Sequence, residues 1–282
     1  MRRVIRHARV ALCALAAAVL SGCIQSSTLI KMKPDGSGTI EQTMTMSAEA
    51  ISQLTALSAM SDDKDKKKAG GLDDLFSDAD ARTAASKLGE GVTFVSSQKI
   101  DTAERKGMKA VYAFTDIRKL KVDEVSMPGG GAASGAGSMA PKDPPMTFSF
   151  QQLPSGNGLL TINQPGIEKA MTEAGSKPKP AASQPDPKMA AAGLEMAKQF
   201  LKGLKIDIAV QVPRVVKTNS SYVSGGTVTL LSMDFDQVLA NPALMDRMNN
   251  AKTLADTKAL LKDVKGFKVN LEPSLSIEFA GR

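Results

Sequence analysis

Two aspartates in this 282-residue sequence stand where carboxylate chemistry could occur. Asp116 and Asp234 each follow a run of residues that alternates like a β-strand, and a hydrophobic residue comes next in both cases. If the two carboxylates share a cleft, they could serve a hydrolase or a transferase as acid and base. If they lie apart, each caps a short helix where the chain leaves a sheet. The similarity of the two segments then reflects either a common strand exit or a duplicated hairpin-plus-helix unit.

The first 23 residues carry the features of a bacterial lipoprotein signal. Four Arg precede an apolar run at residues 10–20, which is too short to span a bilayer. Leu20-Ser21-Gly22-Cys23 follows and resembles the lipobox, at which the cysteine is acylated and becomes the first residue of the mature chain. The resemblance implies a signal peptide at 1–22 and a palmitate-type membrane anchor on Cys23. With Ile24 next, it implies the periplasmic face of the outer membrane, if the organism has one.

Removal of residues 1–22 would leave little conventional catalytic chemistry. It removes His7, which is the only histidine, and Cys13, while the lipid occupies Cys23. Ser-His-Asp triads, Cys-His pairs and metal sites built from His or Cys are thereby excluded from the mature chain. Losing four of the 36 basic residues leaves 32 against 29 acidic residues, so the net charge falls from +7 to +3. We therefore expect no nucleic-acid partner.

Three other motifs are better explained by structure than by chemistry. The run Asp35-Gly-Ser-Gly-Thr resembles the start of a calcium loop, but it lacks the later carboxylates, so a hairpin turn is predicted. The alternating acidic and lysine residues of 62–68 are typical of a solvated loop. Met44 and Met46 share a strand face and could hold a soft metal, but without a neighbouring His we expect them to fill the core. No cofactor or metal site is predicted.

The spacing of apolar residues predicts hairpins separated by helices. Alternation predicts hairpins at 26–46, 92–115 and 146–164, strands at 206–216 and 227–233, and a closing strand pair at 267–279 broken at Pro273. Helical spacing predicts helices at 47–60, 73–88, 189–204 and 243–264, the last as one helix or two. The expected fold class is α+β, with one or two antiparallel sheets built from several hairpins and helices packed on one face.

Two low-complexity segments divide the mature chain. Residues 127–145 are rich in Gly, Ser and Pro, which predicts a linker or insertion, and residues 175–187 are rich in Pro, Ala and Lys, which predicts a loop. They leave a hairpin-helix-hairpin region at 23–126 and a second α+β region at 146–282. The second region either adds to the same sheet or forms a separate domain.

The mature chain also resembles bacterial lipoproteins of uncharacterised function. Its opening, with a strand, an Asp-Gly turn and a second strand directly after the cysteine, is similar to the start of such proteins. Residues 206–228, with Pro213 and Asn219 between two strands, resemble the LppM-type lipoprotein domain. Arg214 stands where that pattern has Gly, and no Trp ends the second strand. The resemblance implies an α+β domain at the membrane surface and supplies no catalytic residues.

The sequence therefore favours a non-enzymatic module of the cell envelope. With almost no tether between Cys23 and the first strand, it would bind or scaffold an envelope protein or a lipid close to the membrane. Two alternatives stay open. One is a carrier of an apolar ligand or lipid between the sheet and the helix that contains Ile51, Leu54 and Leu57. The other is a hydrolase that uses acidic residues such as Asp116 and Asp234.

Overall fold

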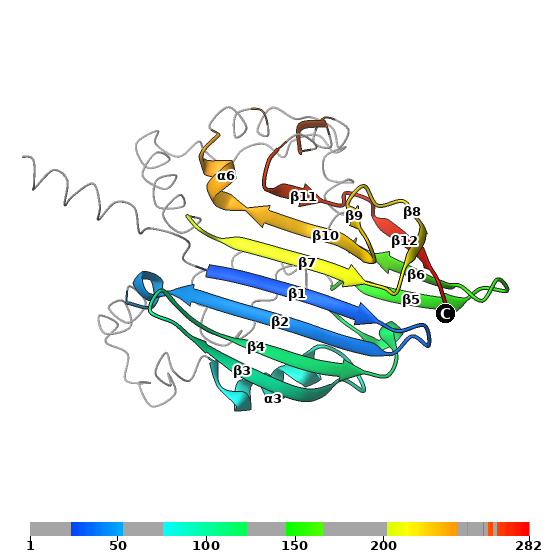
Figure 1. The fold of residues 1–282 in the computed structure, drawn as a ribbon, viewed down its shortest axis with the longest axis horizontal. Helices are drawn as coiled ribbons and strands as arrows, with labels where there is room; N and C mark the ends of the chain where they lie inside the picture. The colour runs from blue at the N-terminus through cyan, green and yellow to red at the C-terminus, as the bar shows by residue number, and fades with distance from the viewer. Residues whose placement is uncertain are drawn as a thin grey trace, which may run out of the picture.

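The computed structural model of the chain describes residues 24–52, 76–122, 145–165, 202–241 and 264–281, together with 247, 256 and 259–261. Within these residues the protein is predominantly β, and its strands form two sheets (Figure 1). The strands of the larger sheet are β1 (Ile24–Met32), β2 (Gly38–Ser47), β3 (Thr93–Asp101), β4 (Arg105–Phe114), β7 (Lys205–Gln211), β9 (Val223–Ser224), β10 (Thr227–Asp234) and β11 (Phe267–Val269). Those of the smaller sheet are β5 (Thr147–Gln152), β6 (Gly158–Asn163), β8 (Val215–Thr218) and β12 (Ser274–Phe279).

The order of strands in each sheet departs from their order in the chain. The larger sheet runs β11-β10-β7-β1-β2-β4-β3, with β9 paired to β10, and the smaller sheet runs β5-β6-β12-β8. Within the described residues, the helical elements that have complete bounds are α3 (Asp78–Lys87), the 3-10 turn η3 (Ile117–Lys119) and α6 (Phe235–Leu239). Residues 48–52, after β2, are also helical.

Local sequence signals account for three hairpins. β1 and β2, β3 and β4, and β5 and β6 are antiparallel pairs of consecutive strands, so the three predicted hairpins are confirmed. The turn between β1 and β2 places Gly36 at a φ of +84°, and the turn between β5 and β6 places Gly156 at +83°. Glycine adopts this left-handed conformation without the strain that a Cβ would cause.

A parallel pair at the centre joins the two halves of the sequence. β1 pairs antiparallel with β2 on one side and parallel with β7 on the other, from Gln25 opposite Lys205 to Lys31 opposite Gln211. Residues 23–126 and 146–282 thus both contribute strands to the larger sheet. The expectation of purely antiparallel sheets is wrong at this pair, because a parallel neighbour lies far away in the sequence and has no turn signal to mark it.

Two predicted strand assignments are correct only in part, and both involve a crossing between the sheets. The strands predicted at 206–216 and 227–233 do pair, as β7 and β10, but only up to Gln211. Residues 206–216 form β7 in the larger sheet and β8 in the smaller one, with Pro213 between them. Residues 267–279 do not pair with each other: β11 lies beside β10, whereas β12 lies between β6 and β8, with Pro273 before it. Proline lacks the N–H that a continuing strand needs in its ladder, so the chain changes sheet at these residues.

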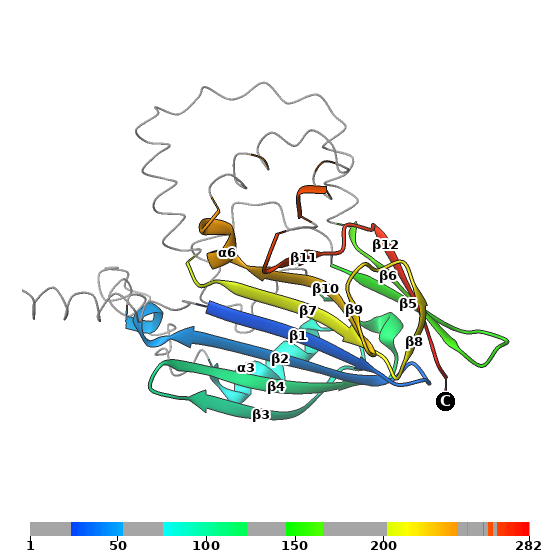
Figure 2. The same ribbon diagram turned by 45° about the horizontal axis from the view of Figure 1, so that its top comes forward.

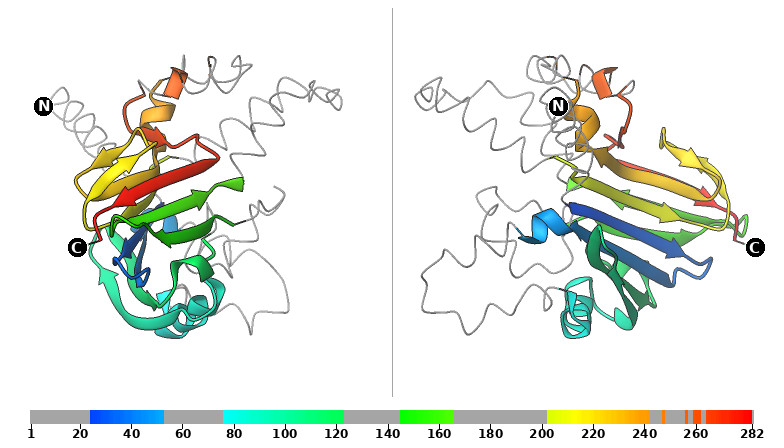
Figure 3. Two further views of the ribbon diagram at one scale, coloured as in Figure 1. Left: turned by 90° about the vertical axis from the view of Figure 1, so that its right-hand side faces the viewer. Right: turned by 60° about the vertical axis from the view of Figure 1, so that its left-hand side comes forward.

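The two sheets share one hydrophobic core. The smaller sheet lies against one face of the larger sheet (Figure 3). Phe150 of β5 covers the turn between β1 and β2, where a Cβ on Gly36 would lie 2.8 Å from the Phe150 ring. Buried side chains from both sheets belong to the same cluster, among them Ile30, Ile40, Tyr112, Leu160, Ile162, Leu275, Ile277 and Phe279.

Helix α3 packs on the same core at the β3 side of the larger sheet (Figure 2). Ser77 caps it by accepting a hydrogen bond from the Asp80 N–H at 3.1 Å, and Gly89 follows its end at a φ of +134°. Ala81 and Ala85 are its buried residues. That helices cover one face of a sheet as a layer stays a prediction.

Several sequence expectations concern residues outside the described part of the chain. These are the signal peptide at 1–22, Cys23, the segments 127–144 and 175–187, most of the helices expected at 47–60, 189–204 and 243–264, and the residues Leu54 and Leu57. Ile51 is described, and it packs half-buried against the core. Among the described helices, none is long and apolar enough to cross a membrane.

Candidate functional site

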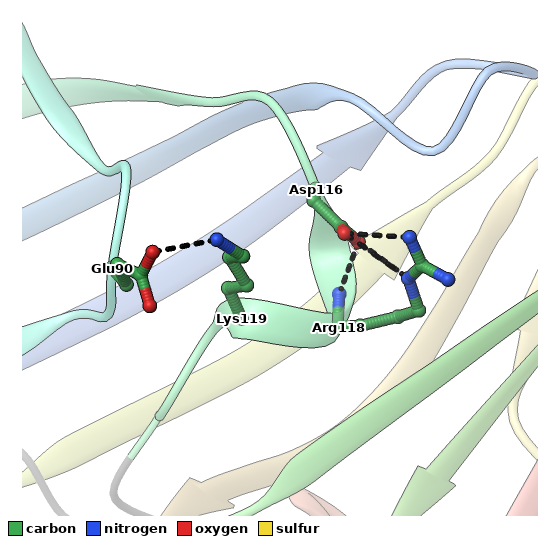
Figure 4. A network of polar contacts seen from close by, with 4 residues as sticks. All are labelled: Glu90, Asp116, Arg118 and Lys119. Atoms are coloured by element: carbon green, nitrogen blue, oxygen red, sulfur yellow. Dashed lines mark hydrogen bonds and ion pairs between the residues drawn. The ribbon is translucent and has the colours of Figure 1, made fainter.

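Asp116 lies two residues after the end of β4 and caps the turn that follows (Figure 4). Its carboxylate accepts a hydrogen bond from the Arg118 backbone N–H at 3.0 Å, which caps η3. The Arg118 guanidinium also donates two hydrogen bonds to this carboxylate, from Nε to Oδ1 at 2.9 Å and from Nη2 to Oδ2 at 2.8 Å. These hydrogen bonds lower the pKa of Asp116 below its ordinary value. A carboxylate held ionised in this way is a cap and an ion-pair partner, and it is poorly suited to donate a proton.

A second ion pair fastens the same turn to the segment after α3. The Lys119 ammonium lies 2.6 Å from the Glu90 carboxylate, which lowers the pKa of Glu90 (Figure 4). Backbone contacts add to it, because the Ile117 N–H donates to the Gly36 carbonyl at 2.9 Å and the Lys121 N–H donates to the Leu88 carbonyl at 2.9 Å. The charged groups around Asp116 therefore fix the position of η3.

Asp234 has a similar local role at the end of β10. Its carboxylate lies 2.8 Å from the Lys205 ammonium, which belongs to the neighbouring β7, and it accepts a hydrogen bond from the Asp236 N–H at 3.2 Å. That second contact lies at the start of α6. The prediction that both aspartates mark the exit from a strand into a short helix is confirmed.

The sheet register keeps the two aspartates apart. Asp234 is level with Lys205 and hence with Gln25, at the start of β1, whereas Asp116 follows Phe114, which is level with Gly38 and Met32, at the end of β1. Gln25 and Met32 are seven positions apart along β1, which corresponds to about 23 Å at ~3.3 Å per residue. The structure therefore does not bring the two carboxylates together, and a hydrolase site built from this pair is contradicted.

The other sequence candidates also have structural roles. Asp35 accepts hydrogen bonds from the Ser37 N–H at 2.9 Å and the Ser37 hydroxyl at 2.7 Å, which lower its pKa and stabilise the hairpin turn. Met44 and Met46 are buried in the core, as expected. Among the described residues, no group of three or more His, Cys, Asp or Glu side chains gathers where it could hold a metal ion.

An amide clasp at the sheet crossing was not found by sequence reasoning. Asn270, which is 3% exposed, donates through Nδ2 to the Thr229 carbonyl and to the Ser220 hydroxyl, both at 2.7 Å. Gln164, which is 4% exposed, donates through Nε2 to the carbonyls of Glu272 at 2.8 Å and Asn270 at 3.2 Å. The only signal in the sequence is an amide residue shortly before a proline. Such a pattern is too common in sequences to identify these residues.

Asn219 completes this clasp on the surface. Its Nδ2 donates to the Ser274 carbonyl at 3.0 Å, and its Oδ1 accepts from the Ser276 N–H at 2.8 Å. Asn219 thus ties the turn after β8 to β12, in place of a backbone ladder. The amide clasp, formed by Gln164, Asn219 and Asn270, supplies hydrogen bonds where the chain passes between sheets.

We define the two ends of the larger sheet by the direction of β1. The proximal end is where β1 begins, and it contains the end of β2, the start of β4 and β7, and the end of β10. The distal end is where β1 finishes, and it contains η3, the end of β7 and the β8–β9 turn. Ile24, directly after Cys23, is the first residue at the proximal end.

No protein-family model matches the sequence, and no curated protein matches it. Among solved structures, the NMR structure of the folded domain of the Mycobacterium tuberculosis protein LppM aligns over 92% of this chain and 91% of that chain. The identity is 9% and the TM-score is 0.31. A TM-score of this size does not establish a shared fold, so the fold and the function are argued from this chain's own residues.

Proposed function

We propose that this chain is a lipid-anchored, non-catalytic binding module of the cell envelope. The observation that carries the proposal is the junction between the lipobox cysteine and the sheet. Leu20-Ser21-Gly22-Cys23 supports acylation of Cys23, and the next residue, Ile24, is already the first residue of β1 and is paired with Met46. A lipid anchor at this position leaves no spacer between the bilayer and the folded sheet.

This junction sets how the module would stand on the membrane. The proximal end of the larger sheet would lie at the lipid headgroups, because β1 starts there. The nine residues of β1 would then carry the distal end about 30 Å outward, at ~3.3 Å per residue. A domain of this kind acts on partners close to the membrane, and we expect an envelope protein or a lipid as its partner. Its place would be the periplasmic face of the outer membrane, if the organism has one.

The chemistry of the described side chains supports a binding role over a catalytic one. Asp116 and Asp234 are tied into caps and ion pairs at opposite ends of the sheet, and the buried amides of Gln164 and Asn270 serve the crossing between sheets. Each of these groups makes hydrogen bonds or ion pairs that would have to break before the group could act on a substrate. The carrier alternative stays a prediction, since two of its three residues lie outside the described part.

The lipid anchor can be tested with a matched pair of cysteine variants. Cells fed an alkyne-tagged palmitate should label the wild-type chain and the variant Cys13→Ser, because Cys13 lies in the signal peptide and is removed. The variant Cys23→Ser should lose the label and accumulate as an uncleaved precursor. Label that persists on Cys23→Ser, or a wild-type chain that takes up no label, would refute the anchor.

A further inference from the structure

Two exposed valines stand on one segment at the distal end of the sheets. Among the described residues, only three large hydrophobic side chains are exposed: Val95 at 55%, Val216 at 49% and Val223 at 42%. Val216 lies in β8 and Val223 in β9, and both belong to residues 213–226, which we call the distal rim (Figure 1). Exposed apolar side chains that gather on one segment often mark a binding surface.

The distal rim is held in place from both sheets. Asn219 binds the backbone of β12 through Ser274 and Ser276, and the Ser220 hydroxyl accepts from the Asn270 amide at 2.7 Å. Within the rim, the Tyr222 N–H donates to the same Ser220 hydroxyl at 3.1 Å. The exposure of the two valines is therefore a fixed feature of the fold. A surface that is already ordered loses little conformational entropy when a partner binds.

The charge of the distal rim has one sign. Arg214 and Lys217 are exposed, and residues 213–226 contain no Asp or Glu. The acid nearest in the sheet register is Glu278, which is opposite Lys217 on β12 and accepts a hydrogen bond from Asn157 Nδ2 at 2.7 Å. A partner segment that carries carboxylates between apolar side chains would complement these two cations and the two valines.

The backbone of the distal rim offers a second element of recognition. β8 is the last strand in the order β5-β6-β12-β8 and pairs with β12 alone, so its outer edge has no partner among the described strands. An extended peptide can add to such an edge through backbone hydrogen bonds, while its side chains meet the pockets and charges beside the strand. Because β8 has four residues, the added segment would be short.

The direction of β7 places this edge where a partner can reach it. β7 is parallel to β1, and the chain continues from its end into the distal rim. If β1 starts at the bilayer, the rim lies at the end of the larger sheet that is farthest from the bilayer, and the lipid anchor does not obstruct it. The location in the envelope rests on the proposed function, whereas the binding chemistry of the rim does not.

We propose that the distal rim binds an extended, acidic segment of a partner protein, which pairs with the free edge of β8 and covers Val216 and Val223. Its carboxylates meet Arg214 and Lys217. The occupant is a segment of a different protein, whereas binding of a second copy of this chain or of a lipid headgroup surface is an outcome that the test below distinguishes.

Site-specific photo-crosslinking in living cells tests the proposal on the full chain. A benzoylphenylalanine residue is placed at position 216 or 223, and the matched control carries it at position 95, which is the third exposed valine and lies on β3. We expect one discrete protein adduct from positions 216 and 223, and none from position 95. Peptide mapping of the adduct should place the crosslink in an acidic segment of the partner.

Charge reversal supplies the second measurement. Combining Arg214→Glu with Lys217→Glu should reduce the adduct yield at position 216 about tenfold, because two attractive contacts become repulsive. Arg214→Gln should reduce the adduct yield by less. Because it adds no acidic residue, it shows whether removal of the positive charge alone lowers the yield. Arg214 is exposed, so the urea midpoint of Arg214→Gln should match that of the wild type. Lys217→Glu places a second carboxylate opposite Glu278, so the double variant should show a small decrease in its urea midpoint, which is measured beside the adduct yield.

The possible outcomes separate this proposal from the lipid anchor. Absence of an adduct at 216 and 223, equal adducts at 95, an adduct of twice the mass of the chain, or a lipid adduct each overturns the binding proposal. Normal palmitate labelling together with any of these results leaves the anchor standing. Loss of labelling with retention of a charge-dependent adduct refutes the anchor and leaves the rim as a binding surface.

Discussion

The amide clasp gives the most quantitative test of how the two sheets are joined. Asn270→Ala removes two hydrogen bonds, both 2.7 Å long, to the Thr229 carbonyl and the Ser220 hydroxyl. Asn270 is 3% exposed, so water does not replace the lost amide at the Thr229 carbonyl without disturbing the core. The Ser220 hydroxyl is half-buried and can turn toward solvent.

The expected cost follows from these two different surroundings. A buried acceptor left without a donor costs about 1–3 kcal/mol, and a hydrogen bond whose partner can find water costs about 1 kcal/mol. We therefore expect Asn270→Ala to lower the free energy of unfolding by about 2–4 kcal/mol. Asn219→Ala also removes two hydrogen bonds, but Asn219 is exposed, so about 1 kcal/mol is expected.

Urea unfolding of residues 23–282, produced without the signal peptide and with Cys23→Ser, measures both variants. Asn270→Asp adds a check on the direction of the hydrogen bond, because a carboxylate facing the Thr229 carbonyl should destabilise more at pH 7 than at pH 4. The reasoning fails if Asn270→Ala costs less than about 1 kcal/mol or no more than Asn219→Ala, because burial would then have no effect on the penalty.

Two further predictions test the core and its pH dependence. Gly36→Ala and Gly156→Ala both force a Cβ onto a positive φ, but the Cβ lies 2.8 Å from Phe150 at position 36 and has no neighbour within 4 Å at position 156. In urea unfolding, the free energy of unfolding should fall by about 1–2 kcal/mol for Gly156→Ala and by about 1–3 kcal/mol more for Gly36→Ala. Equal decreases would contradict packing of the smaller sheet on the turn. Burial raises the pKa of Tyr112 in the folded state to about 12, whereas the unfolded chain keeps the ordinary value of about 10. The free energy of unfolding therefore keeps this contribution below pH 10 and falls by about 2–3 kcal/mol as the pH rises from about 10 to 12. Tyr112→Phe should remove this part of the alkaline decline in urea-unfolding free energy, and an unchanged decline would show that Tyr112 does not titrate differently in the two states.

Alternation and turn residues were sufficient to predict the local pairs. Asp35-Gly36 marked the turn of the first hairpin, and alternation marked the strands of the second and third. Asp116 and Asp234 were recognisable as exits from strands, because capping depends on residues two or three positions away. All of these features involve contacts between neighbours in the chain, so the sequence pattern contains the information that specifies them.

The same patterns could not assign strands to sheets. The run at 206–216 looks like one strand, and 267–279 looks like a pair, but each is divided between the two sheets at a proline. The amide clasp that stabilises these crossings brings together Gln164, Asn219 and Asn270, which are distant in the sequence. Their hydrogen bonds exist only once the crossing has formed, so no local motif announces them.

The hairpins, their turns, the strand exits and the lipobox that we propose as the membrane anchor each depend on residues close together in the chain, so the sequence was sufficient to predict them. Three features became apparent only in the folded chain: β7 lies beside β1, the two sheets share one core, and Asp116 and Asp234 stand at opposite ends of the larger sheet. The same holds for the two valines that stay exposed on the distal rim. Long-range pairing must overcome the entropy of loop closure, and it does so through the combined packing of side chains that are distant in the sequence.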